Sequence, residues 1–198
     1  MTDLADPPMA DEDFAEPAPR VMNRRARSIV EWVLVVGGAL VVAVLIRTFL
    51  FSAYYIPSPS MVPTLKVHDR VLVNKLSYHL HGVRRGDIIV FEPPKTFNDK
   101  TVKDLIKRVI GLPGDTIEAI DGVVYINGHA LREPYLPPGT RTENLPATKV
   151  PADSVFVLGD NRPDSHDSRF PDVGPIPKRL IVGWAFVTVW PLSHLGWL

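Results

Sequence analysis

The stretch from Trp32 to Ile46 runs for fifteen residues without a charged side chain, and most of its residues are apolar. As an α-helix it spans roughly 22 Å, which falls short of a bilayer's ~30 Å hydrocarbon core. Extending the helix to residues 28–51 gives about 36 Å and takes in Glu31 and Arg47, each near one end, where an arginine can reach the lipid head groups. We therefore expect a transmembrane helix over residues 28–51, in contact with a lipid bilayer.

The charges flanking this run predict how the helix is oriented. Four arginines lie just before it, and after Arg47 the next charged residue is Lys66. The positive-inside rule then places the N-terminus in the cytoplasm and residues 52–198 outside the membrane. A cleaved secretory signal also begins with basic residues, but Phe51 stands where cleavage after Ala53 would require a small side chain. The sequence thus favours an uncleaved, single-pass anchor.

Residues 1–27 have a different composition from this run. Residues 1–19 contain six acidic side chains and four prolines, and arginines follow at the end of the segment. Few apolar groups are present to offset the entropy lost on ordering, so we expect a disordered acidic cytoplasmic tail with a basic end. The chain as a whole has no net charge and no cysteine. These two facts argue against a general nucleic-acid binder and exclude disulfides, cysteine nucleophiles and thiolate metal sites.

Proline restricts the part of the chain beyond residue 51, where 16 of the 20 prolines lie. A proline costs about 3 kcal/mol inside a helix, so long helices have little room there. Compact apolar runs instead predict strands, and the Asp121-Gly122 and Asn127-Gly128 pairs predict hairpin turns. The predicted strand segments are residues 70–73, 87–91, 104–111, 117–126, 154–158 and 180–190.

These strands predict a mostly β fold with an antiparallel core and a small cap. We assign the core to residues 52–118 and 151–198. The segment between them, residues 119–150, is rich in turns and less apolar, so we expect it to form the cap.

Two serines stand in a rigid segment just beyond the predicted helix. Ser58 and Ser60 alternate with Pro57, Pro59 and Pro63. Proline fixes its own φ and biases the preceding residue towards extended geometry, so the two hydroxyls are held on one side of the chain. Fixed hydroxyls suit a nucleophile and an oxyanion donor, and Ser60 keeps its backbone N–H. Taken alone, the segment also fits a proline-rich linker with surface serines.

A serine nucleophile needs a base, and a lysine can serve if burial keeps its amine uncharged. Lys107 is the best candidate, because strand neighbours such as Ile106 and Val109 can surround its side chain with apolar groups. Lys75 is the second candidate, and a histidine base at His166 is a minor alternative. A lysine on an edge strand that points to water would leave the same local pattern.

A dense polar cluster follows the predicted strand at residues 154–158. It spans residues 159–169 and includes Asp160, Asn161, Arg162, Ser165, Asp167 and Arg169. Two acid–arginine pairs at i, i+2 spacing, Asp160 with Arg162 and Asp167 with Arg169, can clamp this loop through charge-assisted hydrogen bonds.

Metal-ligand spacing is weak in this sequence. The six histidines form no His-x-x-x-His pair, and His79 with His81 lack a third ligand nearby. We therefore expect no metal site.

Five segments in this order, behind one membrane helix, resemble bacterial type I signal peptidase, also called leader peptidase. The likeness runs from about Arg47 to Trp190. The segments are the Ile-Pro-Ser-x-Ser-Met-x-Pro-Thr-Leu box at residues 56–65 and the runs at residues 69–75, 85–91, 107–115 and 159–169. Each segment alone is suggestive, and the five together in this order are highly specific.

The resemblance implies a membrane-bound serine endopeptidase of the Ser–Lys dyad type. Such an enzyme cleaves N-terminal signal peptides from exported preproteins after small-x-small sites and uses no cofactor. By position, Ser60 matches the nucleophile, Lys107 the general base, and Ser58 the oxyanion-hole hydroxyl beside the Ser60 N–H. Ser165 matches the residue that orients the lysine. The residues that match the supporting loop and its partner are Arg108, Asp160, Arg162, Asp167 and Arg169, with Arg108 facing Asp160.

The resemblance also implies a location and partners, and the sequence departs from the family pattern at two positions. The implied location is the bacterial cell membrane with the catalytic domain outside the cytoplasm, and the protein-export translocon is a further expected partner. Pro59 and His68 stand where the family commonly has other residues, glycine in particular.

Two other functions fit parts of the sequence. A non-catalytic membrane-anchored β-domain, acting as an envelope scaffold or translocon accessory, is the main alternative. A self-cleaving regulator of the repressor type would need a DNA-binding region, and the N-terminus offers an acidic tail and a membrane helix instead.

Overall fold

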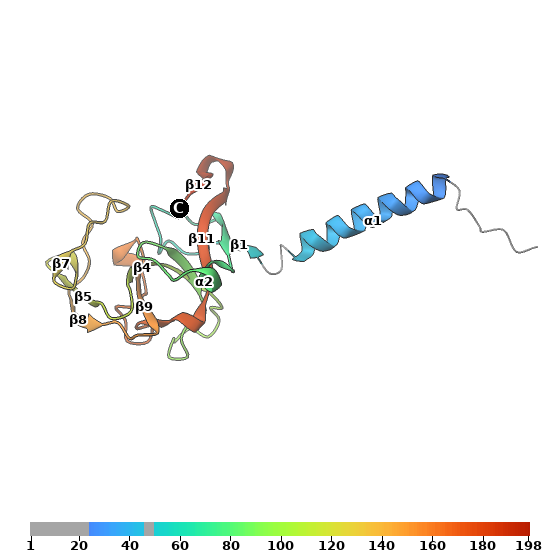
Figure 1. The fold of residues 1–198 in the computed structure, drawn as a ribbon. Helices are drawn as coiled ribbons and strands as arrows, with labels where there is room; N and C mark the ends of the chain where they lie inside the picture. The colour runs from blue at the N-terminus through green and yellow to red at the C-terminus, as the bar shows by residue number, and fades with distance from the viewer. Residues whose placement is uncertain (1–23, 46–49) are drawn as a thin grey trace, which may run out of the picture. The chain divides into compact units, whose positions relative to one another are not determined.

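The computed structural model describes residues 24–45 and 50–198, and the chain divides into two units after Val42. The first unit holds most of helix α1 (Arg24–Leu45), drawn in blue in Figure 1. The 18 residues Arg27–Val44 have a mean hydropathy of 1.9 and are long and apolar enough to cross a membrane. The acidic tail expected before this helix and the head-group contact expected of Arg47 lie outside the described residues.

Helix α1 is apolar on all sides from Trp32 to its end at Leu45. It contains no proline, and its large apolar side chains are exposed, Trp32 by 70% and Leu34 by 69%. A helix that is hydrophobic all round is typical of a membrane span, since a surface helix of a soluble protein keeps one polar face. The helix begins four residues before the predicted range of 28–51. Phe51 was wrongly placed in it, because that residue starts a strand and pairs with Asn74.

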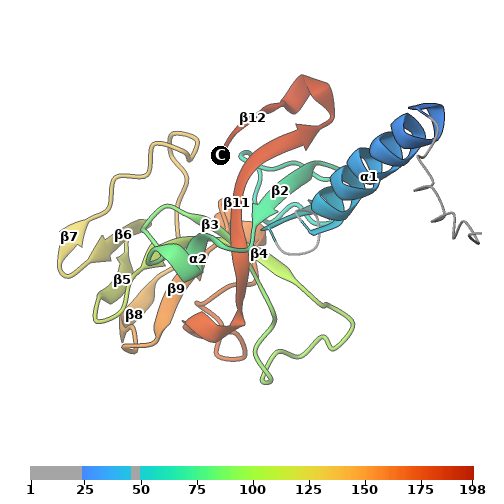
Figure 2. The same ribbon diagram turned by 45° about the vertical axis from the view of Figure 1, so that its right-hand side comes forward.

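The second unit is built on an eight-stranded antiparallel sheet (Figure 1 and Figure 2). Its strands follow the order β1-β2-β11-β3-β4-β9-β10, and β12 pairs with β11. The strands are β1 (Phe51–Tyr55), β2 (Arg70–Asn74), β3 (Ile88–Phe91), β4 (Leu105–Gly111), β9 (Ser154–Leu158), β10 (Ile176–Pro177), β11 (Ile181–Trp190) and β12 (Gly196–Trp197). Strand β11 pairs with β2 on one side and β3 on the other, and register shifts in both ladders let the sheet curl.

A second, four-stranded sheet forms the cap, with the order β7-β6-β5-β8. Its strands are β5 (Thr116–Ile120), β6 (Val123–Ile126), β7 (His129–Ala130) and β8 (Leu145–Lys149). Asp121-Gly122 and Asn127-Gly128 make the two turns, and all four residues have positive φ, between 52° and 93°. This is the backbone of a type I′ hairpin turn, as the sequence predicts.

Short helical elements connect the strands of the core. They are helix α2 (Ser77–Leu80) and the single 3₁₀ turns η2 (Arg162–Asp164), η3 (Lys178–Leu180) and η4 (Leu192–His194). None of them is long enough to form a helical layer, so the described second unit is mostly β.

Clusters of buried apolar residues fix the segments that carry polar side chains. Ile56, Met61 and Leu65 pack with residues of β2, β3 and β11, and each is at most 1% exposed. Because these three residues bracket Ser60, apolar burial holds the serine segment in addition to proline stiffness. A separate cluster joins β5 and β6 to Phe156 of β9 and so anchors the cap on the core.

The mostly β, antiparallel fold expected from the sequence is confirmed. All six predicted strand segments contain strands, and residues 117–126 form the β5–β6 hairpin. Five strands of the described residues are not predicted: β1, β8 and the two-residue strands β7, β10 and β12. Strand β1 continues the apolar and aromatic run of the helix, and β8 contains Pro146, which suits a strand at the edge of its sheet.

Gly183 of β11 has no room for a side chain. A Cβ there would lie 2.8 Å from Val73 Cγ1 and closer still to the Asn74 carbonyl oxygen of β2. We expect Gly183→Ala to lower the free energy of unfolding by about 1–3 kcal/mol, measured by denaturant unfolding of the full chain in detergent. Gly82→Ala is the matched control, because nothing lies within 4 Å of a Cβ at that position. Equal effects of the two substitutions would contradict the packing argument.

Candidate active site

Ser60, the candidate nucleophile, lies in a turn between β1 and β2. It is 6% exposed, and its hydroxyl oxygen lies 3.4 Å from that of Ser58, so the two serines share one side of the chain as predicted. The Val62 N–H donates to the Pro59 carbonyl at 3.0 Å and closes the turn. The segment is therefore part of the folded core and is not a linker.

Lys107 reaches the nucleophile from β4. Its Nζ donates a hydrogen bond to Ser60 Oγ at 2.7 Å, and the residue is only 3% exposed. Ile106 and Val109 on the same strand are buried as well. The apolar neighbours thus shield the lysine as the sequence predicts, and its side chain does not point to water.

Burial lowers the pKa of Lys107 to about 8, because the charged amine loses its hydration in the core. The carboxylates of Asp167 and Asp160 oppose this change in pKa, whereas the Arg169 guanidinium adds to it. With that pKa, roughly a tenth of the amines are uncharged at pH 7. An uncharged amine at hydrogen-bond distance can take the Ser60 proton, so the pair has the chemistry of a nucleophile with its base.

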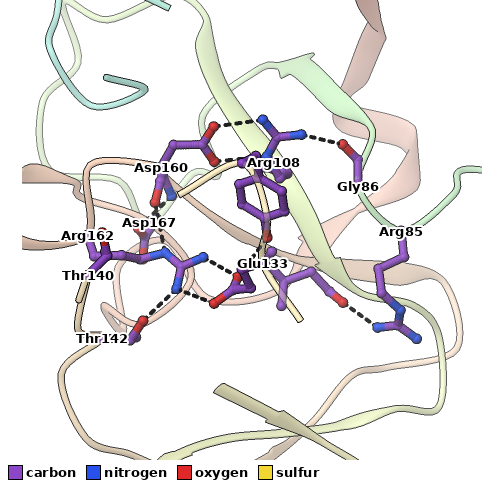
Figure 3. A network of polar contacts seen from close by, with 12 residues as sticks. Arg85, Gly86, Arg108, Glu133, Thr140, Thr142, Asp160, Arg162 and Asp167 are labelled. Atoms are coloured by element: carbon purple, nitrogen blue, oxygen red, sulfur yellow. Dashed lines mark hydrogen bonds and ion pairs between the residues drawn. The ribbon is translucent and has the colours of Figure 1, made fainter. Parts of the chain in front are cut away.

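A buried ion pair lies beside the dyad and links β4 to the polar loop. Arg108 donates to both carboxylate oxygens of Asp160, at 2.9 and 2.7 Å, and also to the Gly86 carbonyl at 2.9 Å (Figure 3). Thr64 Oγ1, from the segment that carries Ser60, donates to Asp160 at 2.5 Å. Asp160 therefore ties the polar loop both to β4 and to the serine segment.

Asp167 organises the rest of the polar loop from a fully buried position. It accepts hydrogen bonds from Ser165 Oγ at 2.7 Å and from the Gly159 N–H at 2.9 Å, and Arg169 Nε donates to it at 2.8 Å. The predicted pairing of Asp167 with Arg169 is therefore present. Arg169 also donates to the Ser165 carbonyl at 3.0 Å, so the loop closes on itself.

The predicted pairing of Asp160 with Arg162 is wrong. The Arg162 side chain donates to Glu133 of the cap, and Arg108 is the side chain that donates to Asp160. Spacing alone does not reveal this, because a bidentate partner from another strand satisfies a carboxylate better than a neighbour two residues away.

Ser165 and the Ser60 carbonyl both lie close to Gly159. A Cβ on Gly159 would lie 2.5 Å from Ser165 Cβ and 2.5 Å from the Ser60 carbonyl oxygen, so only glycine fits between the two serines. Among the hydrogen bonds of the described residues, none joins Ser165 to Lys107, and the Ser165 hydroxyl donates to Asp167. The lysine-orienting role of Ser165 therefore stays a prediction.

Comparison with known proteins identifies the family. Residues 29–190 match the family described as Signal peptidase, peptidase S26. The chain belongs to this family. Membership makes the protein a peptidase, a hydrolase of peptide bonds, and confirms the resemblance inferred from the five sequence segments.

Individual relatives in the signal peptidase family cover most of the chain. The chain is 44% identical to a protein of Leptolyngbya laminosa named Signal peptidase I, and the match covers 99% of this chain and 96% of that protein. It is 36% identical to Signal peptidase I S of Bacillus subtilis, over 86% of this chain and 94% of that protein. A crystal structure of a signal peptidase I from Enterococcus faecalis is 37% identical, with a TM-score of 0.43, and covers 52% of this chain and 97% of that chain.

The alternative bases lie elsewhere in this signal peptidase family member. His166 bonds through Nε2 to Asp172 at 2.8 and 3.0 Å and stacks on Phe170, with ring centroids 4.2 Å apart. Lys75 follows the end of β2, and its side chain has no hydrogen bond to Ser60 in the described part of the chain. Residues 24–45 and 50–198 contain no group of three or more His, Cys, Asp or Glu side chains that could hold a metal.

Two sets of contacts at the site, made by Asn161 and by Arg162, are not predicted from the sequence. The Asn161 N–H donates to the Ser60 carbonyl at 3.0 Å, and its side chain donates to the Pro59 carbonyl at 3.2 Å. Asn161 belongs to the polar cluster, and this position in the sequence could have indicated that it contacts the site. Glu133 and Thr142, which hold Arg162, lie in the turn-rich cap, where no pattern marks a buried partner.

The two departures from the family pattern fit the structure. His68 has a φ of 76°, in the left-handed region that glycine favours, and its N–H still donates to the Ile56 carbonyl at 2.8 Å. Pro59 contributes only its carbonyl, which accepts hydrogen bonds from Val62 and Asn161. The turn around His68 therefore forms without glycine, and proline at position 59 removes no donor that the site uses.

A cleft of about 340 Å³ lies beside the dyad and is lined by its lysine. Ser58 and Lys107 lie on its wall, together with apolar side chains from β1, β3 and β4 such as Tyr54, Val90 and Ile106. A larger cavity of about 590 Å³ lies among residues 92–104 and does not include the dyad. We therefore take the smaller cleft as the place where a peptide would bind.

The lowered pKa of Lys107 has a consequence for stability whose sign is fixed. An unfolded lysine has a pKa near 10.5, so between pH 8 and 10.5 the unfolded chain binds more protons and stability rises with pH. Below pH 8 the folded protein bears the full penalty of burying a charged amine. We expect Lys107→Met to raise the free energy of unfolding at pH 7 by about 1–3 kcal/mol, measured by denaturant unfolding in detergent.

The matched control for this stability measurement is Lys75→Met, which changes a half-buried lysine outside the site. It should leave the free energy of unfolding near the wild-type value. A Lys107→Met protein that is less stable than wild type at pH 7 would contradict the argument from desolvation.

Proposed function

We propose that this protein is a membrane-anchored serine endopeptidase that removes N-terminal signal peptides from exported preproteins with a Ser60–Lys107 dyad. One observation carries the proposal. The Lys107 amine and the Ser60 hydroxyl lie 2.7 Å apart and are both buried, in a chain that belongs to the signal peptidase family. The relatives in that family are named signal peptidase I.

The dyad supports a two-step acyl transfer. Uncharged Lys107 takes the Ser60 proton while Oγ attacks the scissile carbonyl, and the resulting ammonium returns that proton to the leaving amine. An ester joins Ser60 to the signal peptide. Lys107 then removes a proton from a water molecule that attacks the ester, which releases the peptide as a carboxylic acid and restores the serine.

The developing oxyanion needs donors, and two groups near Ser60 Oγ support such a role. Within the described residues the Ser60 backbone N–H has no acceptor, and the Ser58 hydroxyl lies 3.4 Å from Ser60 Oγ. Donors held in place before the reaction stabilise the tetrahedral intermediate without reorganisation. We assign the oxyanion hole to these two groups.

The cleft supports the preference for small-x-small sites. Residues 105–107 of β4 pair with β3, whereas the ladder with β9 begins at Arg108. The other edge of these residues can therefore pair with an extended substrate, whose alternate side chains would then enter the cleft. A cleft of about 340 Å³ lined by Ile56, Val90 and Leu105 accommodates small apolar groups there.

Helix α1 supports anchorage in the same membrane as the substrate. Arginines precede its apolar run, so the positive-inside rule places the N-terminus in the cytoplasm and the catalytic unit outside. A preprotein whose own apolar segment lies in that bilayer then meets the enzyme at a raised local concentration. Contact with the protein-export translocon is part of this proposal.

The decisive test is cleavage of a preprotein by the purified full chain in detergent. We expect the wild type to cut once, after a small-x-small site, and Ser60→Ala and Lys107→Met to lose activity by at least 10³-fold while staying folded. Ser58→Ala should lose about 10²–10³-fold, the usual effect of removing one oxyanion donor.

Lys75→Met serves as the control in this assay and should cleave like the wild type. Full activity in Ser60→Ala would overturn the proposal and favour a non-catalytic scaffold. Full activity in Lys107→Met would instead point to another base.

Cleavage should depend on pH with a midpoint near the pKa of Lys107, about 8. Only the uncharged amine can accept the serine proton, so kcat/KM should fall about tenfold for each pH unit below the midpoint. The measurement is kcat/KM from pH 6 to 9 on one peptide substrate. A flat profile over that range would exclude a lysine base with this pKa.

A further inference from the structure

One buried ion pair, between Glu133 and Arg162, joins the cap to the polar loop at residues 159–169. Both terminal nitrogens of Arg162 donate to the carboxylate of Glu133, one of them at 3.0 Å, and one also donates to Thr142 Oγ1 at 2.5 Å (Figure 3). The Arg162 side chain is only 1% exposed and that of Glu133 is 12% exposed. Glu133 and Thr142 therefore supply the buried counter-charge and a further acceptor for an arginine of the polar loop.

A second contact from the same short segment reaches the other site arginine. The Tyr135 hydroxyl donates to Glu133 at 2.6 Å, and the guanidinium carbon of Arg108 lies 4.0 Å above the centre of the Tyr135 ring. Arg108 in turn holds Asp160 through two hydrogen bonds. One cap segment thus contacts both arginines next to the dyad.

These contacts lead to the nucleophile through the backbone. Arg162 Nε donates to the Gly159 carbonyl at 3.1 Å, and the Asn161 N–H donates to the Ser60 carbonyl at 3.0 Å. Gly159 also lies so close to the Ser60 carbonyl that a Cβ would clash with it. A shift of Arg162 would therefore be transmitted to the backbone that fixes Ser60.

We propose that Glu133 and Tyr135 are positioning residues for the dyad, which hold Arg162 and Arg108 where the 159–162 loop can fix Ser60 against Lys107. This inference rests on the proposed function and adds to it a role for the cap. Neither residue lines the cleft beside the dyad, so they act on the chemical step and not on peptide binding. A displacement of a reacting group by about 1 Å can slow catalysis 10²-fold.

Removal of the Glu133 charge has an electrostatic consequence with a defined direction. The positive charge of Arg162 would then lack its buried partner and would be drawn to Asp160, which otherwise favours the charged form of Lys107. Asp167 and Arg169, the other charged groups that act on Lys107, are unchanged. The unpaired positive charge of Arg162 and the weaker influence of Asp160 on Lys107 both disfavour the Lys107 ammonium. The pKa of Lys107 should therefore fall.

The test compares Glu133→Gln with Glu143→Gln, the same change at an exposed cap position. We expect Glu133→Gln to lower kcat at least tenfold with KM within threefold of wild type, and to move the acidic limb of kcat/KM to lower pH. Glu133→Asp, which keeps the charge, should recover part of kcat. Glu143→Gln should match the wild type in all three measurements.

Tyr135→Phe and Tyr135→Leu separate the two contacts of the tyrosine, and both are milder changes should Glu133→Gln fold poorly. Phenylalanine keeps the ring under Arg108 and should retain more kcat than leucine. Wild-type kcat and an unmoved acidic limb in folded Glu133→Gln, or in Tyr135→Leu if Glu133→Gln does not fold, would overturn the positioning role.

A substrate-free measurement keeps this inference separate from the proposed function. The titration of the Lys107 amine can be followed by NMR of labelled lysine, with Lys107→Met to assign the signal. A lower pKa in Glu133→Gln than in the wild type supports the coupling even if no preprotein is cleaved, and an unchanged pKa counts against it.

Discussion

The hydrogen bond between Lys107 and Ser60 joins two segments 47 residues apart inside an apolar core, and the rest of the second unit is arranged around it. An amine is rarely buried, because dehydration disfavours its charge. Here that penalty is the useful property, since it leaves the amine able to accept a proton near neutral pH. The packing of Met61 and Leu65 with Ile106 of β4, an inner strand of the large sheet, helps to bury this pair.

Full charges surround the dyad without being exposed to solvent, and each is matched. Arg108 pairs with Asp160, Arg162 with Glu133, and Arg169 with Asp167. Among the described residues, no buried side-chain nitrogen or oxygen lacks a hydrogen-bond partner. A partly satisfied network would be costly at such a site, so these pairs act as a unit that sets the position of the loop backbone.

Local patterns were enough to predict the core strands and the hairpin turns, because a buried strand and a type I′ turn each depend on a few consecutive residues. Asp121-Gly122 is an example. The pairing of Arg162 with Glu133 was out of reach, since it joins residues 29 apart and Glu133 lies in the turn-rich cap without a distinctive pattern around it. The end of the membrane helix was misplaced for a similar reason, because Phe51 suits a helix and a strand equally and its partner Asn74 decides. The dyad itself was predictable only by combining segments, as Ser60 alone also fits a linker.

The cap is an excursion of the chain between β4 and β9, and these two strands are neighbours in the large sheet. Both ends of the excursion are thus held at one place by a ladder that does not involve the cap's outer hairpin. Lengthening a loop whose ends are already fixed adds little to the entropy of closing it. The exposed turn at residues 137–139, where among the described residues Thr140 bonds only to nearby Pro137, can therefore accept added sequence during evolution or in protein engineering. The short stretch that touches Arg108 and Arg162 has to keep its register.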